Sequence, residues 1–126
     1  MKRGGMGIAL LAILLIFGIV VSMGMRSVHQ DISRLLDQAA QAAAREDWQQ
    51  AEALALLARD QWVSHHNITA AFADHTPMDE LDGLFAELTV FLDNRESPHF
   101  EATCARLSLL AQAMADSHGV QWWNVL

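Results

Sequence analysis

The feature that most restricts the fold of this chain is an uncharged run of 22 residues near its N-terminus, from Gly4 to Met25, rich in Ile, Leu, Val and Ala. At a rise of about 1.5 Å per residue, a helix of that length measures roughly 33 Å. The hydrocarbon core of a bilayer is about 30 Å thick. The run therefore predicts a short basic N-terminus over residues 1–4 and a single transmembrane helix, a signal anchor, over residues 5–25.

A cleaved signal peptide is the alternative interpretation of this run. Two small residues, Ser22 and Gly24, stand where a peptidase could cut. The apolar core from Met6 to Val21 has sixteen residues, slightly more than the roughly 7–15 of a signal peptide. We therefore expect an uncleaved anchor in the cell membrane. Positive charge on the short N-terminal side favours a cytoplasmic N-terminus, which places the C-terminal domain outside the cytoplasm.

Residues 26–126 form one acidic region. From Ser27 onward, fifteen acidic residues stand against five arginines, which is a formal charge of −10. A domain this acidic, without a basic patch, argues against binding to nucleic acid and against docking on anionic lipid. Its length allows one small domain at most.

The acidic region is predicted to be helical throughout, because apolar residues recur at spacings of three and four and no alternating strand pattern appears. Turn signals divide the region into segments. The stretch Asp116–Gly119 predicts the end of the last helix, with glycine just after it. The helix-start signals are Asp47, after a break expected near Glu46, and the pairs Thr76-Pro77 and Ser97-Pro98.

The expected fold is all-α: one N-terminal transmembrane helix, then a small antiparallel bundle of about four helices arranged as two helical hairpins. A loose internal echo, "AREDWQQAEALALLA" and "RESPHFEATCARLSLLA", about 52 residues apart, supports two hairpins. Helix propensity leaves open whether the first of these helices continues the transmembrane helix without a break. The predicted core positions are Val28, Ile32, Leu35, Leu36, Ala39, Trp48, Ala51, Ala55, Ala58, Trp62, Leu81, Leu84, Phe85, Leu88, Leu92, Phe100, Cys104, Leu107, Leu110 or Ala111, and Met114.

One stretch, Asp74 to Asp82, combines four acidic residues with a histidine. Helix initiation explains most of it, because Thr76 would be the N-cap and Asp79 would reach back toward it in the manner of a capping box. Negative charge in the first turn also meets the positive end of the helix dipole. On this interpretation Asp82 lies deeper in the helix and contributes less to stability than Asp79.

A sensor or ligand-binding module is the functional alternative, since imidazole and carboxylate groups suit Zn²⁺ and similar ions. Its candidate residues are His65, His66, His75 and Asp79. In a hairpin that turns at residues 74–76, however, His65 lies about 13–15 Å from His75 along the helix axis, too far for one ion. We therefore expect no metal and no cofactor.

The chain is not expected to be an enzyme. It has no Tyr, its one Lys precedes the apolar run, and nothing arranges a nucleophile beside a base. The single cysteine, Cys104, falls on an apolar helix face, which predicts a buried thiol rather than a reactive one. Trp48 and Trp62 are expected in the core. Of the adjacent Trp122 and Trp123, one is expected to dock on the bundle and the other to meet a partner or the membrane interface.

Short motifs accompany the basic N-terminus, the membrane helix and the acidic helical domain. They are Asp47-Trp48, Ala51-Glu52, Trp62, His75, Asp79, Asp82, Leu88 and Asn124-Val125-Leu126. In this arrangement the chain resembles a family of bacterial membrane proteins, the domain of unknown function numbered 4363. The resemblance covers nearly the whole chain and implies a topology and a source, not a chemistry.

We expect a membrane-anchored helical domain with a structural or protein-interaction role. Its partner would be another protein or a second copy of the chain, bound through the bundle or through the Trp-containing tail. The sensor or ligand-binding module stays open as the alternative. The residues from which a functional or family-matched site would be built are Trp62, His75, Asp79, Asp82, Trp123 and Asn124.

Overall fold

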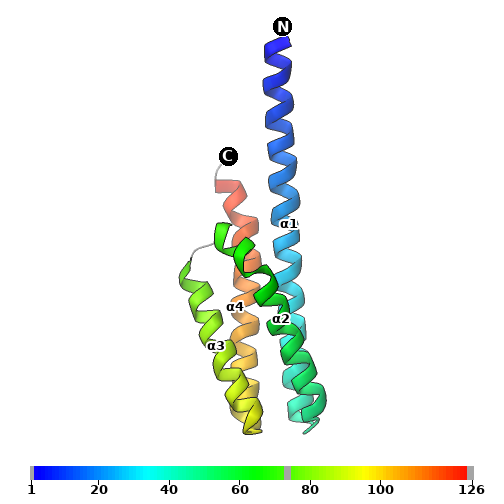
Figure 1. Ribbon diagram of the computed structural model, residues 1–126, viewed down its shortest axis with the longest axis vertical. Helices are drawn as coiled ribbons and strands as arrows, with labels where there is room; N and C mark the ends of the chain where they lie inside the picture. The colour runs from blue at the N-terminus through cyan, green and yellow to red at the C-terminus, as the bar shows by residue number, and fades with distance from the viewer. Residues whose placement is uncertain (1, 73–74, 125–126) are drawn as a thin grey trace.

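The computed structural model describes residues 2–72 and 75–124, and describes side chains for residues 3–21, 23–24, 26–67 and 78–116. Within these ranges the chain is helical and has no strand, so the all-α prediction is confirmed (Figure 1). The four helices are α1 (Lys2–Ala44), α2 (Trp48–Phe72), α3 (His75–Asp93) and α4 (Ser97–Asn124).

Helix α1 is a single unbroken helix with two different halves. In its N-terminal half apolar side chains are exposed all round, as at Ile8, which is 71% exposed, and Phe17, which is 63% exposed. In its C-terminal half Ile32 and Leu36 are fully buried. The exposed half is long and apolar enough to cross a membrane, although a signal sequence near the N-terminus would pass the same test.

The helices run alternately down and up in Figure 1, and α1 extends well beyond the other three at its N-terminal end. Helix α1 packs against α4 and α2, and α3 packs against α4. Of the helix pairs in contact, α2 and α3 pack together least. The C-terminal half of α1 and the facing side of α4 therefore form the centre of the packed region.

The buried core matches the predicted apolar faces closely. Leu35, Trp48, Leu92 and Leu110 are partly buried at its margin, as is Val28. Helix α1 meets its neighbours through alanines near its end, which lets the helices approach closely. The buried core residues are Ile32, Leu36, Ala39, Ala42, Ala43, Ala51, Ala55, Ala58, Trp62, Met78, Leu81, Leu84, Phe85, Leu88, Phe100, Cys104, Leu107, Ala111 and Met114.

The turn between α1 and α2 is closed by a Schellman motif. Glu46 has a left-handed conformation, with φ of 60°. Its N–H donates to the Ala43 carbonyl at 2.9 Å, and the Asp47 N–H donates to the Ala42 carbonyl at 2.9 Å. Asp47 then begins α2, because its Oδ1 accepts the Gln50 N–H at 3.3 Å. The predicted break and N-cap are both confirmed.

The turn between α3 and α4 repeats this geometry. Arg95 has φ of 53°. Its N–H donates to the Leu92 carbonyl at 3.1 Å, and the Glu96 N–H donates to the Phe91 carbonyl at 3.0 Å. The equivalent residues, Glu46 and Arg95, are 49 positions apart. The internal echo is therefore a repeated turn, at a spacing slightly shorter than the sequence alone indicated.

Two helices begin earlier in the chain than the sequence predicted. Helix α3 begins at His75, so Thr76 lies inside the helix and not at its N-cap, and its side chain is outside the described residues. Helix α4 begins at Ser97, and the Glu96 carbonyl accepts its first hydrogen bond. The Ser97 hydroxyl instead donates to the Ala43 carbonyl at 3.2 Å and to Glu101 at 3.2 Å. It therefore joins the two turns rather than capping its own helix.

The predicted stop at residues 116–119 was wrong. Helix α4 continues through Gly119 to Asn124. A single glycine is tolerated inside a helix at a cost of about 1 kcal/mol. In Figure 1, α1 extends past the level at which α4 ends.

Candidate functional site

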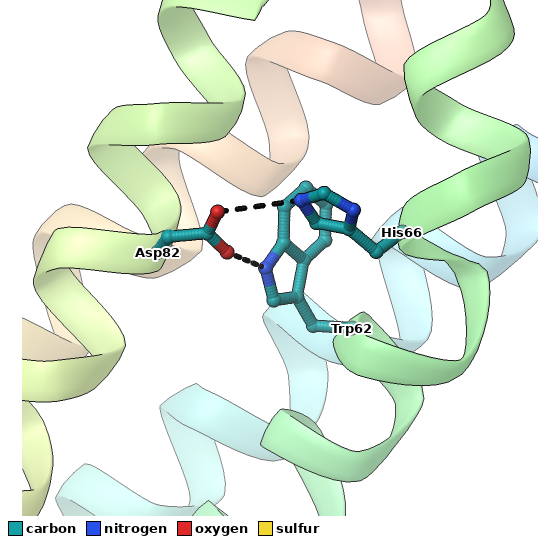
Figure 2. Close-up of polar contacts among 3 residues, drawn as sticks. All are labelled: Trp62, His66 and Asp82. Carbon is teal, nitrogen blue, oxygen red and sulfur yellow. Dashed lines mark hydrogen bonds and ion pairs between the residues drawn. The ribbon is translucent and has the colours of Figure 1, made fainter.

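Three polar or aromatic side chains meet between α2 and α3: Trp62 and His66 from α2, and Asp82 from α3 (Figure 2). Trp62 and His66 are one helical turn apart, so they lie on the same side of α2. Asp82 projects from α3 toward both of them. We call these residues the Trp62 cluster.

Both carboxylate oxygens of Asp82 are engaged in the Trp62 cluster. The Trp62 indole Nε1–H donates to Oδ1 at 2.7 Å. The His66 Nε2 lies 3.3 Å from Oδ2, within hydrogen-bond and ion-pair range. The Trp62 and His66 rings meet edge to face, with centroids 5.5 Å apart and an interplanar angle of 80°. Asp82 therefore holds two α2 side chains at once.

The physical reason for this contact is the burial of Trp62, which is 2% exposed. An indole N–H removed from water requires an acceptor, and a missing one costs about 1–3 kcal/mol. The side chains of Asp82 and His66 are 48% and 36% exposed. Water therefore still solvates the carboxylate while it accepts the buried donor. The cluster ties together α2 and α3, which pack together least among the helix pairs in contact.

A third helix contributes to the same region through His29 of α1. This side chain is 1% exposed, and its ring centroid is 6.3 Å from that of Trp62. Sequence reasoning missed His29 because a histidine on an apolar face carries no motif. The available signal was its position between Val28 and Ile32, on the stripe of α1 that faces the core.

The structure brings together two of the predicted site residues, Trp62 and Asp82, which the sequence offered only through the family resemblance. Asp79 is exposed on α3, one turn earlier. The His65 Nδ1–H donates to the Gln61 carbonyl of its own helix at 2.9 Å. Among the described contacts, His65 and Asp79 thus do not converge on His66.

The remaining predicted site residues are His75, Trp123 and Asn124. Their backbones belong to α3 and α4, but their side chains lie outside the described residues. In the part of the chain whose side chains are described, no group of three or more His, Cys, Asp or Glu residues is placed to hold a metal ion.

Cys104 is fully buried on α4, as predicted. Burial, reinforced by the charges of Asp37 and Glu101, raises the pKa of this thiol from 9.0 to about 12. A thiol reacts as the thiolate. At neutral pH the Cys104 side chain therefore acts as a small hydrophobic group and not as a nucleophile.

A second polar feature lies between α1 and α4. The buried hydroxyls of Ser33 and Ser108 are 2.7 Å apart, and the Gln112 amide donates to the Ser33 Oγ at 2.9 Å. Ser33 and Gln112 border an open hollow of about 430 Å³ that is also lined by Arg34, Asp37 and Asp116. The serines satisfy each other, so this contact fixes the register of α1 against α4.

The outer surface of α2 carries apolar side chains that the core does not use. Leu57 is 47% exposed and Val63 is 62% exposed. Between α2 and α3 lies a small hollow with a volume of about 10 Å³. It is lined by Ala55, Leu56, Arg59, Phe85, Leu88, Thr89 and Leu92.

Comparison with known proteins adds the family and nothing about chemistry. No curated protein and no solved structure matches the chain. The model of the family described as "Domain of unknown function (DUF4363)" matches residues 19–125, which include the packed half of α1 and all of α2, α3 and α4. This match covers most of the sequence, as the resemblance predicted. The chain is a member of the DUF4363 family.

Proposed function

We propose that this chain is a single-pass membrane protein whose helical domain has a structural or protein-interaction role and no enzymatic activity. Residues 5–25 would span the cell membrane, with the N-terminus in the cytoplasm. Residues 26–126 would form a small antiparallel bundle of two helical hairpins outside the cytoplasm.

The observation that carries this proposal is the continuity of α1. A single helix, Lys2–Ala44, forms the exposed apolar segment with its N-terminal half and the centre of the packed domain with its C-terminal half. Between Met23 and Ile32 there is no turn or flexible linker. A domain joined in this way has a fixed distance and orientation relative to its membrane segment. Such a connection suits a structural element or a docking platform better than a domain that must move freely.

The polar chemistry of the described residues supports a structural role for the Trp62 cluster. Asp82 uses both of its oxygens within the cluster. Cys104 is buried and protonated at neutral pH. These contacts stabilise the packing of α2 and α3. They do not favour the sensor or ligand-binding alternative, because Asp82 engages Trp62 and His66, and the His65 Nδ1–H donates to the Gln61 carbonyl of its own helix.

The exposed apolar side chains of α2 support the protein-interaction part of the proposal. Leu56 is 41% exposed and Val63 is 62% exposed, and they lie on one side of α2 because they are seven positions apart. Exposed apolar side chains that share one face commonly mark a protein contact. The hollow between α2 and α3 is too small to receive another helix, so a protein partner would lie across the surface of α2.

Site-specific photo-crosslinking in intact membranes tests this proposal. A photoreactive residue at Val63, Leu56 or Thr89 should give one discrete crosslinked product. The matched controls are Glu52 and Arg106, which are exposed and polar. Crosslinks at Val63, Leu56 and Thr89 and not at the controls would support a protein contact. Equal labelling at all positions, or lipid adducts only, would contradict it.

A further inference from the structure

The contacts between α1 and α4 show which of their residues lie at the same level, and this alignment can be extrapolated to the C-terminal end of α4. Ser33 pairs with Ser108, and the carbonyl of Ala43 pairs with Ser97. Since both helices rise by about 1.5 Å per residue in opposite directions, residues of α1 and α4 lie level when their numbers add up to about 141. By this rule Asp116 is level with Met25, and Asn124 is level with Phe17.

Burial along α1 extends into the apolar run. Gly18 and Val21 are half-buried, whereas Phe17, Ile19 and Val20 are exposed. Gly18 and Val21 continue, at spacings of three and four residues, the stripe of α1 that includes Val28 and packs against its neighbours. The packed region therefore reaches the level of Gly18, well inside the apolar run of α1.

The charges of both helices stop at the same level. Going toward its N-terminal end, α1 has Arg26 as its last charged residue before the apolar run. In α4, Asp116 is the last charged residue before the C-terminal end, because residues 117–124 include no Asp, Glu, Lys or Arg. These two residues lie within about one helical position of each other along the pair. One plane, perpendicular to α1, therefore separates charged from uncharged helix on both elements.

We propose that this plane is the membrane surface, and that the last two turns of α4 insert beside α1 into the interfacial layer of the lipid bilayer. The proposal rests on the membrane anchor proposed above and adds a second, lipid-contacting element to it. From Asp116 to Asn124 the helix rises about 12 Å. The interfacial layer on each side is about 5–8 Å thick, so this segment would cross the layer and its last turn would lie in the outermost few ångströms of the hydrocarbon.

The composition of this segment suits that depth. Its last turn contains Trp122 and Trp123, and tryptophan is enriched where a bilayer meets water. Indole combines a large apolar ring with an N–H donor, so it is stable in a layer that offers both lipid chains and water. The bundle would then meet the membrane through two adjacent helices, which would hold its tilt more firmly than one.

Fluorescence quenching of the full chain in phosphatidylcholine vesicles tests this proposal. The emission of Trp122 and Trp123 is obtained as the difference between wild type and the Trp122→Phe/Trp123→Phe double variant. We expect this difference emission to be blue-shifted, to be mostly lost when the lipid chains are brominated, and to be little affected by aqueous iodide. The matched control is Trp48→Phe, because Trp48 lies by the turn at the far end of the packed region. Its difference emission should not respond to brominated lipid.

Alkaline extraction of the same vesicles separates this proposal from the anchor itself. If the chain is extracted, the membrane anchor fails. If the chain resists extraction but iodide quenches the difference emission, the anchor stands and the insertion of α4 is wrong. If neither quencher acts, the two tryptophans are enclosed by protein, either α1 or a second copy, and the lipid contact is again wrong.

Discussion

The indole N–H of Trp62 in α2 donates a 2.7 Å hydrogen bond to Asp82 in α3, and of the helix pairs that pack together these two do so least. The donor is buried in the core, and the acceptor is half exposed at the surface. This relationship explains Asp82 better than helix initiation does. The carboxylate is needed by a tryptophan 20 residues earlier in the chain, not by the start of its own helix.

Replacement of Asp82 should therefore destabilise the fold. Asp82→Ala leaves the buried Trp62 N–H without its acceptor, and should lower the free energy of unfolding by about 1–3 kcal/mol. Asp82→Asn should cost less, because the amide oxygen still accepts the bond but loses the added strength of a charged acceptor. The measurement is urea unfolding of the full chain in a mild detergent.

Asp79→Asn is the matched control for this series, one turn away on the same helix and exposed. The capping interpretation predicts that replacing Asp79 lowers the free energy of unfolding more than replacing Asp82 does. The hydrogen bond to Trp62 predicts the opposite order. If Asp79→Asn costs more than Asp82→Ala, the hydrogen bond to Trp62 contributes little, and the acidic stretch acts mainly through the helix end.

Cys104 should make stability depend on pH in the alkaline range. The unfolded thiol ionises near pH 9.0, while the folded thiol keeps its proton up to about pH 12. Stability due to this group is thus complete below pH 9 and is lost as the pH rises through that window, with a slope of up to about 1.4 kcal/mol per pH unit. The sequence has no Tyr to obscure the effect.

Urea midpoints of wild type and Cys104→Ala, measured between about pH 8 and pH 11, test this slope. The variant will be less stable at every pH because of lost packing, so the slopes are compared and not the midpoints. Stability should fall with pH in wild type and stay flatter in the variant. Identical slopes would mean that the Cys104 pKa is not raised by folding.

The two left-handed turn residues offer a test of the fold that does not touch the core. Glu46→Gly should stabilise the chain by up to about 1 kcal/mol, because a left-handed φ is strained for a residue with a Cβ and not for glycine. Arg95→Gly should behave in the same way. Glu46→Ala is the control, since alanine keeps the strain. Thermal or urea unfolding measures the stability of each variant against wild type. A Glu46→Gly variant that is less stable than wild type would contradict the turn geometry.

Local patterns predicted most of the fold. The spacing of apolar residues located the core faces of all four helices, and Asp47 marked the start of α2 correctly. At residues 116–119 the glycine did not end the helix, because one glycine is tolerated inside a helix. At Ser97 the local signal was replaced by contacts with α1, through the Ala43 carbonyl. Such contacts cannot be derived from the residues of one helix.

The site was less predictable than the fold. Trp62 and Asp82 were candidates, but nothing in their spacing of 20 residues indicates a hydrogen bond, because the bond depends on how α2 and α3 cross. His66 was assigned to a ligand set with His65, although consecutive residues on a helix point in different directions. His29 lies in another helix altogether and has no local signal.

The orientation in the membrane is a separate prediction. A reporter that is active only outside the cytoplasm, fused after Leu126, should be active, because Lys2 and Arg3 favour a cytoplasmic N-terminus. Changing both residues to Glu should reduce that activity. An inactive fusion on a correctly inserted chain would reverse the assigned orientation.

The most direct test of the membrane-anchored domain is the intact mass of the protein recovered from cells after alkaline extraction of membranes. If the apolar half of α1 is an uncleaved anchor continuous with the packed domain, the chain stays in the membrane pellet and has the mass of all 126 residues, 13.9 kDa. A lighter chain in the soluble fraction, cut near Ser22 or Gly24, would identify the segment as a signal peptide and contradict the anchor.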